Sequence, residues 1–322
     1  MADLTILFAT HNGAPTLPRM LDALENLEPG DGPVKIVAVD NASTDGSAEL
    51  IKARYGRLPI TLLSEARLGK NIALNKGLSE IEGDLVVLTD DDIIPHRDWL
   101  TSIQRVAEEQ PSYDIFGGAI YPLWEKIPEE WVLRNVPKGW FGWTDFNEGP
   151  IKPNNVWGGN MTVRAKVFSD HRFFEGIGPN GTRKYEDIEF TLRAAKAGHM
   201  CWHSRSAVVG HIIRADQLRS EWLLQRAYNQ AKGWRHFNSD KSSGRDVIRE
   251  LFSAAYDLIH ASLFGSFEDK FKAKLRLRRS QGDLVERCSW RKLFKNSRGV
   301  KIRLNVIRLS KRWGARQAAR FY

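Results

Sequence analysis

Hydrophobic and polar positions along the first 110 residues alternate between two periods. Leucines recur at helical spacing from Leu17 to Leu27, a helix is expected to reach Tyr55, and a further helix is expected over 71–81. Short apolar runs that end in polar residues predict strands at 4–10, 34–39, 60–63 and 85–89. Strands that alternate with helices indicate βαβ units and a largely parallel sheet. The expected fold class is α/β.

The pattern is more mixed after residue 110. A Gly-, Pro- and Asn-rich loop is expected at 176–183, followed by a helix over 185–197. From Leu218 the chain has a helical pattern and becomes increasingly basic. Apolar runs predict three further strands, at 115–121, 156–163 and 208–213. We therefore expect a first domain of 1–215, with halves of 1–110 and 111–215, and a helical C-terminal region of 216–322.

Charge separates that C-terminal region from the rest of the chain. The whole protein of 322 residues has a net charge of +9. Residues 241–322 contain 21 Lys and Arg against 7 Asp and Glu, a net of +14, so the remaining residues carry −5. The basic character therefore needs an explanation of its own.

Cysteine content and hydropathy indicate the compartment. Cys201 and Cys288 are the only cysteines, which excludes a disulfide framework and fits a reducing environment. We recognise no secretory signal, and no apolar run reaches the ~18 residues that span a bilayer. The expected location is the cytoplasm.

Three acids directly follow the predicted strand at 85–89. Asp90, Asp91 and Asp92 would lie at its carboxyl end, where open α/β sheets bind ligands. Adjacent carboxylates repel one another unless a cation neutralises them, and Mg²⁺ or Mn²⁺ bound by few protein oxygens commonly shares its shell with phosphates. The pattern favours a metal–diphosphate site. A solvated acidic turn is the alternative.

Polar residues also end the two preceding strands. Thr10 follows the first, and Asp40 with Asn41 follows the second. Parallel strands end at one edge of a sheet, so these groups should face the cleft beside the three acids. Asp40 and Asn41 could hydrogen-bond a base or ribose, although turn chemistry alone would also explain them.

Six segments, in this order, resemble family 2 glycosyltransferases of the GT-A fold. They are Ala9-Thr10-His11-Asn12, VDNASTDGS (39–47), GKNIALNKGL (69–78), LTDDDIIP (88–95), WGGNM (157–161) and YEDIEFTLRAAKAGH (185–199). The resemblance spans roughly residues 4–215. It implies a Rossmann-like, mostly parallel mixed sheet flanked by helices. It also implies an enzyme that moves a sugar from a nucleotide-diphosphate donor with inversion.

The resemblance implies a metal site at the three acids. Asp90 and Asp92 match the family's DxD positions and would hold Mn²⁺ or Mg²⁺ against the donor diphosphate. His211 stands where similar enzymes often place a further ligand, and an imidazole beside two carboxylates would favour Mn²⁺. A packed or capping histidine is the alternative for His211.

The resemblance places catalysis at Glu186 and Asp187. An inverting transfer needs one carboxylate to take the proton of the acceptor hydroxyl, and the family's base position falls on Asp187. The alternative is that Glu186, Asp187 and Glu189 are first-turn acids that complement the helix dipole.

The remaining motif positions are assigned to substrates by the same resemblance. Lys70 could neutralise phosphate or be a solvated lysine, and the many tryptophans between 124 and 157 could stack on sugars or pack in the core. Expected nucleotide-sugar contacts are Ala9, Thr10, Asn12, Asp40, Asn41, Lys70, Asn71 and Asp91. Expected acceptor contacts are Trp157, Gly158, Gly159 and Asn160.

Two departures from the family pattern limit what is implied. Many relatives have arginine where this chain has Leu74, so one contact is missing. Processive synthases carry a QxxRW motif and membrane spans, whereas Gln230 to Trp234 has glycine at the arginine position. Transfer of one sugar per encounter is expected, from a UDP-sugar to a glycan or polyprenyl-linked acceptor, in surface polysaccharide or glycolipid synthesis.

The basic C-terminal region has three interpretations. Ile302, Val306, Leu309 and Trp313 fall near one helical face among basic residues, which favours contact with an anionic membrane surface at the inner face of the cell membrane. Nucleic-acid binding is not expected, because no base-reading motif accompanies the charge. A solvated appendage is the third interpretation.

Two other functions are weighed against glycosyl transfer. A sugar nucleotidyltransferase would need a Gly-rich basic phosphate loop after the first strand, which residues 11–15 do not supply. A non-catalytic protein that binds membrane or nucleic acid through its basic region would have no chemical need for Asp187 beside Asp90 and Asp92.

Overall fold

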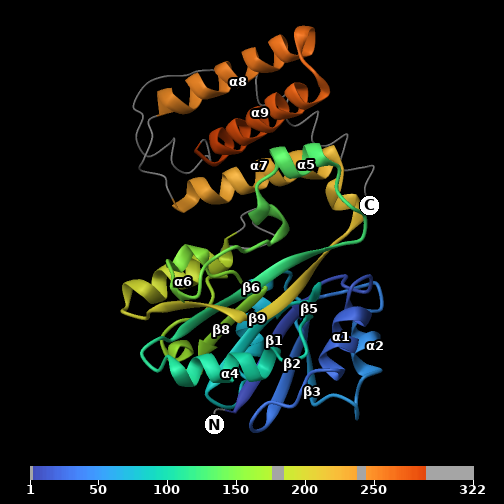
Figure 1. The fold of residues 1–322 in the computed structure, drawn as a ribbon, viewed down its shortest axis with the longest axis vertical. Helices are drawn as coiled ribbons and strands as arrows, with labels where there is room; N and C mark the ends of the chain where they lie inside the picture. The colour runs from blue at the N-terminus through green and yellow to red at the C-terminus, as the bar shows by residue number, and fades with distance from the viewer. Residues whose placement is uncertain (1–2, 176–184, 238–243, 288–322) are drawn as a thin grey trace. The chain divides into compact units, whose positions relative to one another are not determined.

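The computed structural model describes residues 3–175, 185–237 and 244–287 (Figure 1). The predicted loop at 176–183 and the predicted amphipathic segment after residue 300 lie outside these ranges. The strands are β1 (Leu4–Thr10), β2 (Val34–Asp40), β3 (Ile60–Ser64), β4 (Leu85–Asp90), β5 (Ile93–Pro95), β6 (Ile115–Trp124), β7 (Gly149–Pro150), β8 (Asn160–Arg164) and β9 (Cys201–Ile213).

The helices lie mostly between the strands of the first half and after the last strand. The α-helices are α1 (Leu17–Glu25), α2 (Ser47–Lys52), α3 (Lys70–Gly77), α4 (Trp99–Glu109), α5 (Glu130–Asn135), α6 (Glu186–Lys196), α7 (Ser220–Phe237), α8 (Gly244–Phe264) and α9 (Phe267–Arg287). Short 3-10 turns are η1 (Lys138–Phe141), η2 (Pro153–Asn155), η3 (Ala165–Ser169) and η5 (Ala215–Leu218).

The strands form a single mixed sheet in the described part of the chain, in the order β3-β2-β1-β4-β8-β6-β9-β5, with β7 also paired to β9. Strands β1 to β4 run parallel, as the alternation of strand and helix predicted, whereas the short β5 pairs antiparallel with β9. Strand β8 is inserted antiparallel between β4 and β6, and β6 pairs parallel with β9. The predicted α/β class is confirmed.

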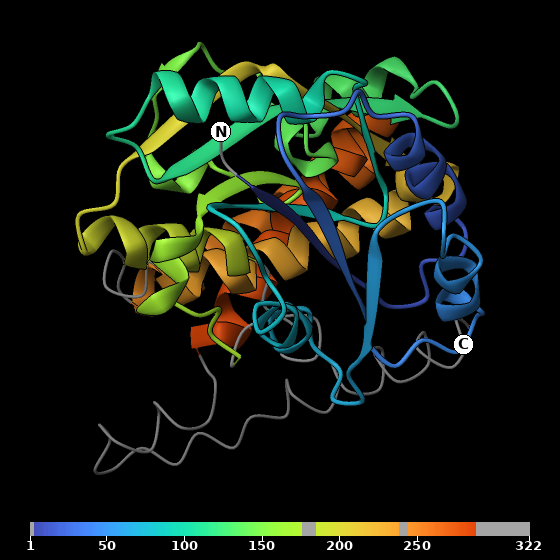
Figure 2. The same cartoon turned by 90° about the horizontal axis from the view of Figure 1, so that it is seen from below.

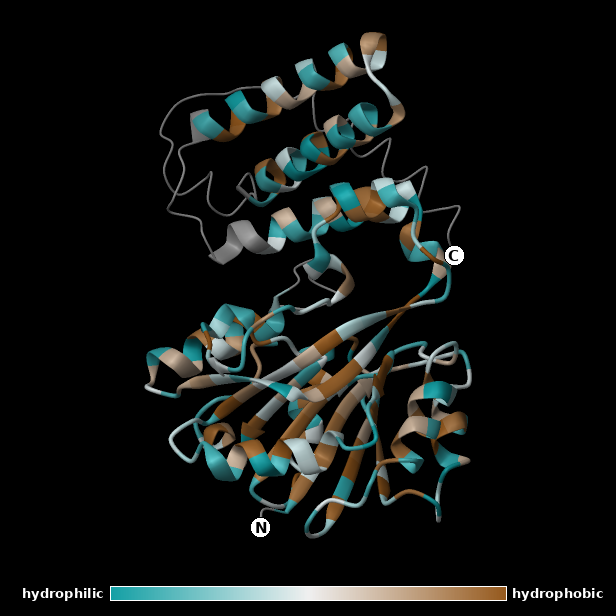
Figure 3. Cartoon of the chain, viewed as in Figure 1, coloured by the Kyte–Doolittle hydropathy of each residue, from teal (hydrophilic) through white to brown (hydrophobic). Residues whose placement is uncertain are grey.

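The alternating apolar side chains of β1 fill two separate cores. Ile6 and Phe8 pack on one face against α1, α2 and α4, whereas Leu7 packs on the other face with α3 and α6. Because both faces of the sheet are covered, the strands are apolar almost throughout, which explains their continuous hydrophobic runs. Figure 3 shows these runs in brown through the centre of the sheet, and Figure 2 shows the sheet from below.

Two strand predictions need correction, and helices α4 and α5 and strand β5 were not predicted. The strand predicted at 156–163 begins only at Asn160, because residues 156–159 form a turn at the glycine pair. The strand predicted at 208–213 starts at Cys201 and pairs with β6 from Ile115 onward. Its first half contains several polar residues, so the alternation of apolar and polar positions is not visible there in the sequence. Helix α4 was not predicted, although Trp99, Ile103 and Val106 have helical spacing and are buried.

Helices predicted after Leu218 are present as α7, α8 and α9. A third core joins α5, η1 and the end of β9 to α7 and α9, through residues that include Leu223 and Phe271. Trp131 contacts Phe271 edge-on at 4.6 Å between ring centroids, and Arg134 bonds Glu268 at 2.5 Å. These helices belong to the same compact unit as the sheet, which ends at Glu286.

Candidate active site

The polar ends of the first-half strands meet at one edge of the sheet. Thr10 is in register with Asp40 on the neighbouring strand, and Ala9 is in register with Asp90 on the other side. The three polar clusters that follow β1, β2 and β4 therefore lie side by side, as parallel pairing requires.

Asp91 is turned inward against the end of β1. Its Oδ2 accepts a hydrogen bond of 2.5 Å from the Thr10 hydroxyl. A Cβ on Gly13 would lie 2.2 Å from that oxygen, so only glycine fits the loop there. Burial, helped by the charges of Asp92 and Asp90, raises the pKa of Asp91 to about 7. These contacts indicate that Asp91 supports the loop that follows β1.

Asp90 is paired with Lys70 at the start of α3. The Lys70 Nζ lies 2.5 Å from Asp90 Oδ1 and 3.7 Å from Glu186 Oε1. Burial disfavours the charged amine, but the carboxylates of Asp90 and Glu186 outweigh that effect and raise the pKa of Lys70. The ammonium is therefore held as a cation between an acid of β4 and an acid of α6.

Asp92 is paired with His211 on β9. The His211 Nε2 lies 3.3 Å from Asp92 Oδ2, and the Nδ1 lies 2.7 Å from the Phe141 carbonyl oxygen. Burial opposes charge on both groups, but their mutual attraction lowers the pKa of Asp92 and raises the pKa of His211. The contact with Phe141 orients the ring so that Nε2 faces the acids.

The donor types of a divalent-metal site are present at this edge. Within the described ranges, no three carboxylate, imidazole or thiolate groups are already gathered around one point. Asp90 is instead paired with Lys70, and Asp92 is paired with His211. Two carboxylates and an imidazole suit Mn²⁺ or Mg²⁺, and the Lys70 ammonium occupies the position of a counter-cation beside Asp90.

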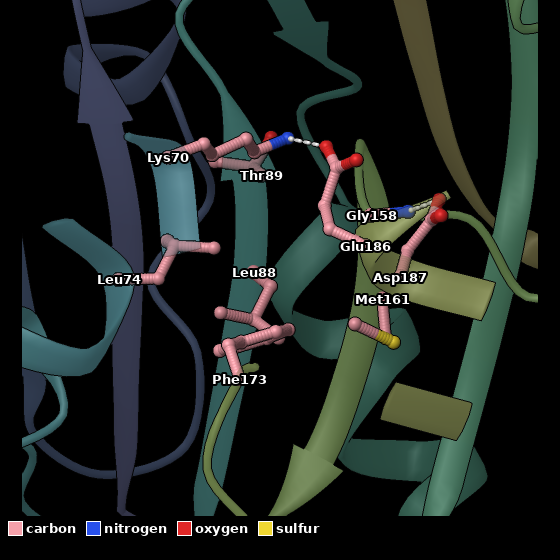
Figure 4. A pocket seen from close by; sticks show the side chains of 9 residues that line it. All are labelled: Lys70, Leu74, Leu88, Thr89, Gly158, Met161, Phe173, Glu186 and Asp187. Atoms are coloured by element: carbon pink, nitrogen blue, oxygen red, sulfur yellow. Dashed lines mark hydrogen bonds and ion pairs between the residues drawn. The ribbon is translucent and has the colours of Figure 1, made fainter. Parts of the chain in front are cut away.

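Asp187 is fixed at the first turn of α6 (Figure 4). Its Oδ2 accepts a 2.9 Å hydrogen bond from the Gly158 amide, and its Oδ1 accepts one from the Ile188 amide. Burial, aided by the negative charge of Glu186, raises the pKa of Asp187 to about 6. The preceding residue, Tyr185, has a left-handed backbone with φ of 88°, which turns the chain sharply into the helix.

Asp187 and Lys70 line one small cavity. Its volume is about 10 Å³, room for about one water molecule. A sugar can enter there only if a lining side chain moves. The wall is apolar below the charged groups and is made of Leu74, Leu88, Met161 and Phe173 (Figure 4).

The predicted nucleotide contacts lie around the ends of β1 and β2. Asn41 is buried and holds the following loop: its Nδ2 donates to the carbonyls of Glu65 and Arg67, and its Oδ1 accepts from the Gly69 amide. Asn12 is exposed, with a left-handed φ of 54°. Asp40 borders a surface depression of about 400 Å³ between β3 and α2.

Asn71 is the second residue of α3, next to Lys70. Its Nδ2 donates to the Phe174 carbonyl, whereas its buried Oδ1 has no hydrogen-bond partner among the described residues. An oxygen buried without a partner costs about 1–3 kcal/mol. Asn71 therefore offers an unused acceptor close to the Lys70 site.

The predicted acceptor contacts separate into two groups. Trp157, Gly158 and Gly159 form the turn before β8 and are half-buried beside Asp187 and Asp90. Asn160 is buried within the sheet, where its amide accepts from Trp99 Nε1 and donates to the carbonyls of Ala119 and Ala207. Every polar atom of that side chain has a partner in the fold.

One charged residue near the site was not singled out by sequence. Arg226 of α7 has a buried Nε that lacks a hydrogen-bond partner within the described residues. Burial lowers the pKa of Arg226 to about 10, although Asp92 and Glu186 act in the opposite direction. A charged residue between Leu223 and Ala227, both buried on the same helix, was the available signal.

Fold and site together are those of an α/β enzyme with paired acids at the strand ends, and comparison with known proteins gives the family. Residues 5–172, about half of the chain, match the family described as "Glycosyl transferase family 2". The chain belongs to this family and is a glycosyltransferase. The three acids at 90–92 and Lys70 fall inside the matched part, whereas Asp187, His211 and Arg226 follow it.

Two relatives come from Haloferax volcanii. "Glycosyltransferase AglE" is 24% identical over 71% of this chain and 72% of its own length. "Glucosyl-dolichyl phosphate glucuronosyltransferase" is 23% identical over 62% of this chain and 65% of its own length.

A solved structure has the same fold. The mannosyltransferase PcManGT from Pyrobaculum calidifontis, solved with GDP-Man and Mn²⁺, has a TM-score of 0.59 at 18% identity. The alignment covers 91% of this chain and 88% of that one. This similarity identifies the GT-A fold. In the part of this chain that the structure describes, none of the helices combines the length and apolar character needed to cross a bilayer.

Proposed function

We propose that this enzyme is an inverting, metal-dependent, non-processive glycosyltransferase that uses a nucleotide-diphosphate sugar, a UDP-sugar in particular. The observation that carries the proposal is the placement of Lys70, which pairs with Asp90 and lines one cavity together with Asp187. One carboxylate stands on the acceptor side, and the other stands at the strand end where a diphosphate would bind.

The donor side would hold the diphosphate with Asp90, Asp92 and a divalent metal. The metal, when bound, supplies charge stabilisation for the leaving diphosphate. Mn²⁺ and GDP-Man are bound in PcManGT, which supports metal use by this fold. Lys70 would leave Asp90 and stay near the phosphates, because its positive charge is matched by them. Asp40 and Asn41 lie at the neighbouring strand end, where the nucleoside would be placed.

Asp187 would act as the base. With a pKa of about 6 it is mostly ionised at neutral pH, yet it is more basic than an ordinary aspartate. Its hydrogen bond with the Gly158 amide fixes the carboxylate beside the turn that ends at β8. From that position it would take the proton of the acceptor hydroxyl while the hydroxyl oxygen attacks the anomeric carbon and the diphosphate leaves. A single displacement inverts that carbon.

An Asp187→Asn variant tests the base. The amide keeps the shape and can still accept from Gly158, but it cannot take a proton, so transfer should fall by about 10²–10⁴-fold. Donor affinity should change little. Glu189→Gln is the matched control, because Glu189 lies in the same helix turn but pairs with Arg193 away from the cavity. Transfer is measured as nucleotide release over a panel of UDP-, GDP-, CMP- and dTDP-sugars, with and without Mn²⁺.

The anomeric configuration of the product tests whether transfer proceeds with inversion. We expect ¹H NMR of the new linkage to show the anomeric configuration opposite to that of the donor. Retention, or transfer by Asp187→Asn at the rate of the control, would contradict the mechanism. Full activity after exhaustive chelation would contradict the proposed dependence on a divalent metal.

The acceptor is proposed to be lipid-linked, a polyprenyl phosphate or a glycan carried on one. Support comes from the relative named as a glucosyl-dolichyl phosphate glucuronosyltransferase. Such acceptors lie in a membrane, so the enzyme would have to work at its surface, in surface polysaccharide or glycolipid synthesis.

Helix α8 offers a surface suited to that contact. Its buried side, Val247, Ala254 and Ala261, repeats every seven residues. The opposite side exposes a row at helical spacing, the α8 stripe, whose central members are 62–71% exposed: Phe252, Tyr256, Ile259 and Leu263. Large exposed apolar patches mark interaction sites.

An anionic bilayer is the occupant that charge favours. The neighbouring helix α9 exposes Lys272, Lys274 and Arg279. The sequence from residue 288 to the end has 11 Lys and Arg and no acidic residue. Anionic lipid headgroups would attract this charge, whereas a second copy of the chain would repel it. We therefore propose peripheral contact through the α8 stripe.

Vesicle sedimentation tests the contact. The full chain should bind vesicles that contain phosphatidylglycerol more strongly than vesicles of phosphatidylcholine alone. Replacing Phe252, Ile259 and Leu263 together by serine should remove most binding. Ile127→Ser, at a residue that is 84% exposed on another part of the surface, is the control. Unchanged vesicle binding by the triple variant, or a change only in oligomeric mass, would refute this surface as the membrane contact.

A further inference from the structure

Arg226 is a half-buried cation, and its Nε is fully buried without a hydrogen-bond partner among the described residues. It lies on α7 between Leu223 and Ala227, which are buried in the third core. Its guanidinium lies over the Trp222 ring at 5.2 Å from the centroid. In the described part of the chain, its shielded Nε donates no hydrogen bond, and no salt bridge to Arg226 is found there. A guanidinium has five N–H donors, so most of its bonding capacity is unused.

The surroundings of Arg226 link it to the active site. The charges that act on it come from Tyr185, Asp92 and Glu186. Asp92 follows β4 beside Asp90, and Glu186 lines the cavity with Asp187. Arg226 therefore brings a positive charge from α7 to the same site that Lys70 reaches from α3.

A structural role explains this arrangement poorly. A buried N–H donor is normally paired, because one left without a partner costs about 1–3 kcal/mol. Stacking on Trp222 occupies one face of the guanidinium and leaves its edge, where the N–H groups point, for another molecule. A planar fork of donors matches an oxyanion with two oxygens, and arginine is the residue best suited to bind phosphate in that way.

We propose that Arg226 binds a phosphate oxyanion of a substrate, which supplies the hydrogen-bond acceptors that the protein does not. The inference rests on the proposed function, because both of its substrates contain phosphate. The phosphate comes either from the nucleotide-diphosphate donor or from the lipid phosphate of the acceptor. Either source places α7, which lies outside the part matched to the family, in direct contact with substrate.

The test compares three variants. Arg226→Met removes the charge and the fork, and Arg226→Lys keeps the charge without the fork. Arg219→Met is the matched control, because Arg219 is exposed just before α7 and has no side-chain partner among the described residues. The probes are UDP and GDP with Mn²⁺, inorganic pyrophosphate, farnesyl phosphate and farnesol, each measured by calorimetry, together with the melting temperature of the ligand-free protein.

A ligand-binding role and a structural role predict opposite changes in stability. Without ligand, Arg226→Met should melt at the same temperature as the unaltered protein or higher, since it loses a buried donor that has no partner among the described residues. It should bind at least one phosphate probe more than tenfold more weakly, with Arg226→Lys intermediate and Arg219→Met unchanged. Weaker binding of UDP, GDP and pyrophosphate would identify the donor diphosphate. A loss confined to farnesyl phosphate, with farnesol unaffected, would identify the acceptor phosphate.

Equal binding of every phosphate probe by Arg226→Met and the unaltered protein would overturn the inference. So would unfolding of Arg226→Met together with unaltered probe binding by a folded Arg226→Lys. The proposed function is judged separately by sugar transfer. Phosphate binding that depends on Arg226 without any transfer would refute the function alone, and transfer with unchanged kinetics in Arg226→Met would refute this inference alone.

Discussion

At the scale of single residues, Asp187 differs from the other acids of its helix turn. Glu189 is paired with Arg193 at 2.8 Å and faces away from the cavity. Asp187 has backbone amides as its hydrogen-bond donors and shares its surroundings with Glu186. Two acids two positions apart therefore have different chemistry, one structural and one suited to proton transfer.

The raised pKa predicts how activity depends on pH. The base must be ionised, so kcat/KM should fall about tenfold per pH unit below a pH of about 6. Rates measured between pH 5 and 8 at fixed Mn²⁺ would show this limb. Asp91 also titrates in this range, at about 7. If an Asp91→Asn variant still loses activity below a pH of about 6, the fall in activity is assigned to Asp187. If the variant no longer loses activity there, that assignment is wrong.

The sequence predicted the acids at the strand ends because strand and acid are adjacent in the chain. It did not predict that Asp91 turns inward, since that depends on Thr10 and Gly13, about 80 residues away. Arg226 was missed for a similar reason. On a helix, its neighbours in sequence do not reveal which distant charges approach it.

At the scale of elements, the amide of Asn160 joins the two halves of the sheet. Its hydrogen bonds reach α4 through Trp99, β6 through Ala119 and β9 through Ala207. A Cβ on Gly118 would lie 2.1 Å from the Nδ2 of Asn160, so only glycine fits at this position of β6. The same place is where the register between β6 and β9 shifts.

Asn160→Ala should therefore destabilise the protein more than an ordinary surface change. Three buried polar groups would lose a partner, which together costs about 3 kcal/mol. The measurement is the free energy of unfolding from urea denaturation. Asn155→Ala is the control, because no side-chain hydrogen bond is found for Asn155 among the described residues. A loss equal to that of the control would show that water replaces the amide.

Element boundaries were predictable where local sequence determines them. The strands of the first half are continuous apolar runs with covered faces, and they were found almost to the residue. The turn at 156–159 and the full length of β9 were not, because both depend on pairing with β6 rather than on local pattern. The helices after Leu218 were predicted, but the packing of α9 against Trp131 could not be predicted from the sequence.

At the scale of the whole molecule, Lys70 connects parts that are far apart in the chain. It pairs with Asp90 of the donor side and Glu186 of the acceptor side. The family match ends at residue 172, between these two acids. The ion pair therefore joins the matched part to the elements that follow it.

Lys70→Met should make stability depend on metal. Removing the ammonium leaves two carboxylates unneutralised, and because Lys70 and Asp90 side chains are 23% and 32% exposed, we expect a loss of about 2 kcal/mol. Mn²⁺ alone, without nucleotide, should raise the melting temperature of the variant more than that of the unaltered protein. Lys52→Met, which breaks only an exposed pair with Glu49, is the control. Equal Mn²⁺ shifts in both proteins would contradict the expectation.

The bridging position of Lys70 has a kinetic consequence. While it holds Glu186, the cavity beside Asp187 has room for about one water molecule. A donor that draws the ammonium toward its phosphates would release Glu186 and open the way for the second substrate. The two substrates would then add in a compulsory order, donor first. Nucleotide product would compete with the donor and act as a noncompetitive inhibitor toward the acceptor.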